Sequence, residues 1–114
     1  MDRRDAIKEY KKTVQPMGIV QVRNLRDNRV YLTASANTMG TINSIRFQLK
    51  MGNFLPSAGL AKDWKELGEE NFVVEVLDEL KPVDDPAHDY RDDLKALEAM
   101  WLEKLKPFGE RGYH

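Results

Sequence analysis

Residues 17–34 read MGIVQVRNLRDNRVYLTA, a pattern of two strand-forming segments separated by turn-forming residues. Its first part, residues 17–24, is rich in β-branched side chains, which favour a strand. Its last part, residues 29–34, alternates between two kinds of side chain, as a strand with two different faces does. Asp27 and Asn28 lie between the two parts and tolerate the left-handed backbone conformations of a tight turn. The sequence therefore predicts a β-hairpin.

The rest of the chain supplies helices and one more strand, with boundaries set by proline, glycine and apolar periodicity. The predicted elements are a helix over 2–13, a helix over 41–51, a short helix over 60–67, a strand over 71–78, a surface loop over 81–90, a helix over 94–105 and an irregular tail over 107–114. A hairpin and a third strand with helices on their faces indicate a small α+β domain in the order α-β-β-α-α-β-α. We expect residues 1–16 to form an N-terminal helix or arm and residues 17–114 to form one domain.

The composition is ordinary for a globular protein of 114 residues, with 41% hydrophobic and 32% charged residues. The absence of cysteine excludes disulfides and thiolate metal sites. No apolar run approaches the roughly 20 residues of a membrane span, and the first residues lack the apolar core of a signal peptide. We therefore expect a cytoplasmic protein with no membrane partner.

The charge is unevenly distributed along the chain, although the net charge is only −1. Residues 1–53 carry ten Lys and Arg against four Asp and Glu, whereas residues 54–114 carry eight against fifteen. A basic half can face phosphate. Within residues 1–53, we expect four basic residues to contact DNA: Arg23, Arg26, Arg29 and Lys50. The alternative is a mixed surface on which the two blocks have no functional meaning, since halves of a sequence need not be faces.

Two of the predicted helices each carry one charge within an apolar stripe. In residues 94–105 this charge is Glu98, and in residues 41–51 it is Arg46, at the same offset from the neighbouring apolar positions. Charged side chains are rarely buried unless they are paired or bind a ligand. The two residues are therefore the candidates for a functional site.

Together with Tyr31, these two charges suit phosphodiester chemistry. A carboxylate such as Glu98 can hold Mg²⁺, which needs only one or two protein carboxylates. The guanidinium of Arg46 can stabilise charge on a phosphate, and a phenol can orient water, or deprotonate it if its pKa is lowered. The alternative is structural: Arg46 and Glu98 form a partly buried ion pair, and Tyr31 is an amphipathic core residue.

Other common sites are disfavoured by the residues available. No glycine-rich phosphate loop is present. The only histidines are His88, in a predicted loop, and His114, the last residue, which makes a Ser-His-Asp triad or a histidine-based metal site improbable.

The ordered set of motifs resembles the GIY-YIG nuclease family. The matching segments are Gly18-Ile19-Val20, Asn24, Tyr31-Leu32-Thr33, Asn43, Arg46, Asp63-Trp64, Gly68–Phe72, Leu97–Leu102 and Gly112-Tyr113. The resemblance covers about residues 17–113. It implies a three-stranded antiparallel sheet flanked by helices, and metal-dependent hydrolysis of DNA by an activated water with Mg²⁺ or Mn²⁺. It also implies roles: Tyr31 matches the second-motif tyrosine, Arg46 the helix arginine and Glu98 the metal-binding glutamate.

Three positions depart from the family pattern. Val20 stands in place of the first-motif tyrosine, Thr33 in place of the second-motif glycine, and His114 in place of an asparagine that follows the final Gly-Tyr. The loss of one tyrosine fits a slow endonuclease. It also fits a catalytically inactive module on the same fold, which binds nucleic acid or a protein partner.

Overall fold

The computed structural model describes residues 15–85 and 87–114. The predicted helix over residues 2–13 lies outside this part of the chain. The described residues form a three-stranded sheet with three helices, as the sequence predicts.

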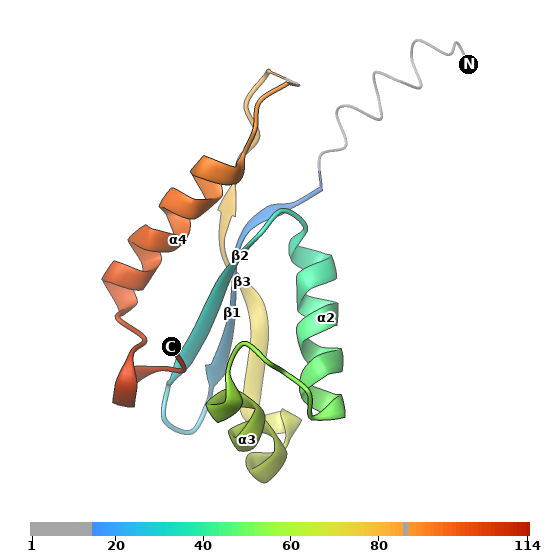
Figure 1. The fold of residues 1–114 in the computed structure, drawn as a ribbon, viewed down its shortest axis with the longest axis vertical. Helices are drawn as coiled ribbons and strands as arrows, with labels where there is room; N and C mark the ends of the chain where they lie inside the picture. Colours follow the sequence, from blue (N-terminus) through green and yellow to red (C-terminus); the bar gives the residue numbers. More distant parts are fainter. Residues whose placement is uncertain (1–14, 86) are drawn as a thin grey trace, which may run out of the picture.

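All three strands are antiparallel, in the order β2-β1-β3, so that β1 is central (Figure 1). Their bounds are Met17–Asn24 for β1, Val30–Ser35 for β2 and Phe72–Leu80 for β3. The predicted hairpin is confirmed, and Asn28 adopts the left-handed conformation in its turn, with φ 64°. The register places Val22 opposite Tyr31 and Val20 opposite Thr33. These four side chains therefore lie on the same face of the sheet.

Helices cover both faces of this sheet, as Figure 1 shows: α4 lies on one side, and α2 and α3 on the other. Their bounds are Thr38–Met51 for α2, Ala58–Leu67 for α3 and Arg91–Leu105 for α4. The 3-10 turn η1 (Glu69–Asn71) leads into β3, and η2 (Gly109–Arg111) follows α4. No helix within the described residues is long and apolar enough to cross a bilayer.

Two apolar clusters hold the layers together. The larger lies between the sheet and the α2–α3 face, and its buried members are Val20, Val22, Ile45, Leu49, Phe54, Leu60, Trp64, Phe72, Val74 and Tyr113. The smaller lies under α4, where Leu97, Trp101, Leu102 and Leu105 pack on Ile19, Val30 and Leu32. The sheet is therefore buried on both faces, and its edges are the places where side chains and backbone can reach solvent.

The tail differs from the predicted irregular segment, because it pairs with the edge of β2. Gly112 forms a parallel bridge with Val30, and the Tyr113 N–H donates to the Val30 carbonyl at 3.0 Å. Tyr113 is buried in the larger cluster. The tail therefore runs along β2 and ends beside it (Figure 1).

Candidate active site

The candidate site lies at the outer edge of β2, where α4 supplies Glu98. The Ala34 N–H, which points away from the sheet, donates to Glu98 Oε2 at 2.8 Å. Glu98 is half-buried. The carboxylate that the sequence places in an apolar stripe thus lies at the margin of the covered face, where it satisfies an edge amide that otherwise has no strand partner.

His114 reaches the same edge from the tail. Its Nε2 accepts the Leu32 N–H at 3.0 Å. Because that nitrogen accepts a hydrogen bond, the proton of the neutral ring lies on Nδ1. No local pattern in the sequence predicts this contact, which joins residues 82 positions apart.

Tyr31 is held between two rings. The His114 ring stacks on it, with centroids 4.8 Å apart and planes within 7° of parallel. The Phe54 ring meets it edge to face at 5.3 Å. These contacts fix the direction of the phenol, and Tyr31, Glu98 and His114 together form one cluster at the β2 edge.

Burial raises the pKa of Tyr31, and the Glu98 carboxylate raises it further, while Thr33 opposes the rise. Tyr31 is therefore a neutral phenol at neutral pH. Deprotonation of water by Tyr31 would require a lowered pKa, and the pKa shift found here has the opposite direction, which favours a phenol that orients water. Burial also lowers the pKa of His114, against the opposing effect of Glu98.

Arg46 does not share the environment of Glu98. Its side chain is exposed on α2, whereas Ile45 and Leu49 of the same helix are buried. The ion pairs among the described residues join Arg29 to Asp27 and Asp63, His88 to Asp93, and Arg91 to Asp89. The structural alternative of an Arg46–Glu98 ion pair is therefore wrong, as is the placement of Arg46 in the buried stripe.

The first-motif position, where the family has a tyrosine, is occupied here by Val20, whose side chain packs in the core. Val20 is 0% exposed and lies directly across from Thr33. A tyrosine and a glycine in the family pattern thus correspond here to a valine and a threonine that face each other across two strands. The two departures are neighbours in space.

The fit of a metal ion rests on Glu98 alone. No group of three or more His, Asp or Glu side chains suited to a metal occurs among the described residues. Glu98 Oε2 is bonded to the Ala34 N–H, and Oε1 makes no hydrogen bond within this part of the chain. Mg²⁺ keeps several waters and accepts one protein carboxylate, so the residues fit a hydrated ion held at Glu98 Oε1 and do not fit a site built from several protein ligands.

The basic residues expected to contact DNA have different surroundings. Arg29 is occupied, because its guanidinium binds Asp27 at 2.8 Å and also binds Asp63. Arg23 is half-buried at the end of β1, and Arg26 is exposed in the hairpin turn.

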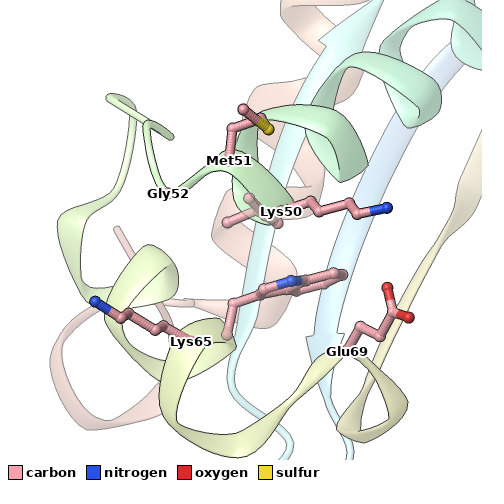
Figure 2. Close-up of a pocket in the computed structure, with 7 residues that line it drawn as sticks. Lys50, Met51, Gly52, Lys65 and Glu69 are labelled. Carbon is pink, nitrogen blue, oxygen red and sulfur yellow. The ribbon is translucent and has the colours of Figure 1, made fainter.

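Lys50 is exposed at the end of α2, where it lines a pocket of about 360 Å³. The other lining residues are Leu49, Met51, Gly52, Trp64, Lys65 and Glu69. Figure 2 shows Lys50 and Lys65 pointing in opposite directions, so the two ammonium groups do not converge on one anion. The pocket also contains none of the residues of the β2-edge cluster.

The structure is similar to two solved structures of one nuclease domain. The catalytic domain of the homing endonuclease I-TevI matches with a TM-score of 0.69 and 22% identity, over 85% of this chain and 95% of that one. A glutamate-to-alanine variant of the catalytic domain of the intron endonuclease I-TevI matches with a TM-score of 0.70 and 20% identity, over 88% and 93%. No family model and no curated protein matches the sequence. The chain therefore has the GIY-YIG fold of the I-TevI catalytic domain, as the sequence motifs predict.

Proposed function

We propose that this chain is a nuclease domain that hydrolyses DNA phosphodiester bonds slowly, with a divalent metal ion. The observation that carries the proposal is the Glu98 carboxylate at the β2 edge, with one oxygen bonded to Ala34 and the other free for an ion beside Tyr31. The likeness to an endonuclease catalytic domain supports it.

In this proposal each residue of the site has a separate task. Glu98 Oε1 holds Mg²⁺ or Mn²⁺, which when bound neutralises charge on the phosphate and lowers the pKa of a bound water. Tyr31, as a neutral phenol, orients the attacking water through its hydroxyl. Arg46 is exposed and is available to contact the phosphate backbone, as are Arg23 and Arg26.

The substitution Glu98→Gln tests the proposal, because an amide oxygen can still accept the Ala34 N–H while the negative charge is lost. We expect metal-dependent nicking of supercoiled plasmid to fall by about 100-fold or more, since a metal contact supplies several kcal/mol of transition-state stabilisation. The matched control is Glu103→Gln, which changes an exposed carboxylate on the same helix and should leave the rate unchanged. Cleavage that survives in Glu98→Gln, or that persists in EDTA, would contradict the proposal.

A second candidate function is binding of nucleic acid without cleavage. The observation that favours it is Val20, a buried side chain without a hydroxyl at the first-motif position. This function predicts affinity that weakens steeply with salt, equal affinity in wild type and Glu98→Gln, and no cleavage by either. The same plasmid and binding measurements therefore separate the two candidates.

A further inference from the structure

A cluster of polar side chains anchors the tail at a point that the proposed reaction does not use. The Tyr113 hydroxyl donates to Asp63 Oδ2 at 2.8 Å and accepts a hydrogen bond from the Asn24 amide nitrogen at 3.0 Å. Arg29 binds the same Asp63 carboxylate, and its guanidinium carbon lies 4.7 Å from the centroid of the Tyr113 ring. We call these four residues, from β1, the hairpin turn, α3 and the tail, the tail clamp.

The tail clamp is buried at its centre and partly exposed at Arg29 and Asp63. Asn24 is fully buried and Tyr113 nearly so. Burial raises the pKa of Tyr113 to about 12, with a further contribution from Asp63, so the phenol keeps the proton that it donates. A hydrogen bond from a neutral donor to a carboxylate is among the stronger kinds.

The backbone of Tyr113 is fixed as firmly as its side chain. Its N–H donates to the Val30 carbonyl at 3.0 Å, and its own carbonyl accepts the Ser57 hydroxyl at 3.1 Å. The next residue is His114, whose ring lies on Tyr31 and whose Nε2 accepts the Leu32 N–H. The clamp therefore ends one residue before the ring that stacks on Tyr31.

We infer that the tail clamp positions His114 against Tyr31, which makes Tyr113 and Asp63 positioning residues for the β2-edge site. The inference rests on the proposed function only where it gives Tyr31 the task of orienting water. The His114 ring stacks on the Tyr31 ring, and the Phe54 ring contacts it in a T-shaped arrangement. Loss of the stacked imidazole therefore allows the Tyr31 phenol to turn. Small displacements of an orienting group lower a rate strongly, by up to about 100-fold for 1 Å.

The substitution Tyr113→Phe tests the inference, because it removes the clamped hydroxyl and keeps the buried ring. We expect the Leu32 amide to exchange its hydrogen about tenfold faster, since its acceptor His114 is held less firmly. We expect the Tyr31 ring proton shifts to move, because they report the stacked imidazole. We also expect kcat for DNA cleavage to fall about tenfold at unchanged KM, as for a group that acts in the reaction step.

Three further variants complete the design. Asp63→Asn keeps an oxygen that accepts the Tyr113 hydroxyl and loses the charge that binds Arg29, so its effects should be smaller than those of Tyr113→Phe. Glu66→Gln changes an exposed carboxylate on the same helix and should change nothing. Tyr113→Phe added to His114→Ala should cause no further loss of kcat, because the clamp acts through His114.

The outcomes distinguish this inference from the proposed function. If Tyr113→Phe leaves the Leu32 exchange rate and the Tyr31 ring shifts as in wild type, the clamp does not position His114. If all amides exchange faster by the same factor, the hydroxyl serves overall stability and the inference is overturned. If wild-type protein cuts no DNA but the two NMR signals change as expected, the proposed function fails and the positioning of His114 against Tyr31 stands.

Discussion

Replacing Val20 by tyrosine and Thr33 by glycine in one chain is expected to raise metal-dependent DNA cleavage by about 100-fold, the lower end of the range that a positioned proton-transfer group contributes. Val20 lies opposite Thr33, on the face of the sheet that carries Tyr31. The double substitution therefore adds a second phenol beside the first and removes the side chain that it would meet. The measurement is the nicking rate of supercoiled plasmid at saturating Mg²⁺ or Mn²⁺.

The single substitutions show why two are needed. Val20 is fully buried, so Val20→Tyr alone overpacks the larger apolar cluster and should cost about 2 kcal/mol of unfolding free energy. Thr33→Gly alone weakens a strand by about 1 kcal/mol and adds no chemistry. The matched control is Val20→Phe with Thr33→Gly, which has the same ring without the hydroxyl and should show no gain. Equal rates for the phenylalanine and tyrosine pairs would show that the missing hydroxyl does not limit the reaction.

Gly18→Ala is expected to lower the free energy of unfolding by about 4 kcal/mol, at the upper end of single substitutions. Gly18 is in the central strand, next to the irregularity between Ile19 and Val20, and its φ is +155°. A Cβ atom there would lie 2.0 Å from the Asp78 carbonyl oxygen. Because that oxygen belongs to the backbone of β3, relief requires the two strands to separate. Urea unfolding followed by circular dichroism measures the loss.

Gly52→Ala is the matched control for this prediction. Gly52 also has a positive φ, 77°, as the C-cap of α2, but a Cβ there meets nothing within 4 Å. Its loss should be only about 1 kcal/mol, the conformational cost of an L-residue in the left-handed region. If both alanine variants lose the same free energy of unfolding, the close approach of β1 and β3 is not the reason that Gly18 must be a glycine.

The hairpin, the third strand and the three helices α2, α3 and α4 could be predicted because their signals are local. Alternating side chains and the Asp27-Asn28 turn are enough for β1 and β2. Helix α2 begins three residues before the predicted start because Asn37 caps it, accepting the Gly40 N–H at 3.1 Å. The mostly small residues around Asn37 are typical of a loop as well as of a helix N-cap, so the sequence alone does not fix the first residue of this helix.

The site could be predicted only in part. Helical periodicity shows on which side of a helix a residue lies, but it does not show how much of that side the sheet covers. Arg46 and Glu98 have the same offset within their stripes, yet Arg46 is exposed and Glu98 is half-buried against Ala34. The difference arises because α4 passes the edge of β2, where an unpaired amide is available. No pattern within the helix carries that information.

The tail was beyond local prediction for the same reason. His114 contacts Leu32 and Tyr31, and Tyr113 contacts Asn24, across more than 80 residues. The segment has no periodicity of its own, since it gains its conformation by pairing with β2. The tyrosine and the histidine at the end of the tail were the available hints.

An NMR titration of the ¹⁵N-labelled chain with Mn²⁺ tests directly whether Glu98 holds a metal ion. We expect the Ala34 amide, which bonds to Glu98 Oε2, to be among the first signals to broaden, and we expect Glu98→Gln to abolish this effect while Glu103→Gln does not. An Ala34 signal that stays sharp while other amides broaden, or equal broadening in wild type and Glu98→Gln, would show that Glu98 does not hold the metal ion.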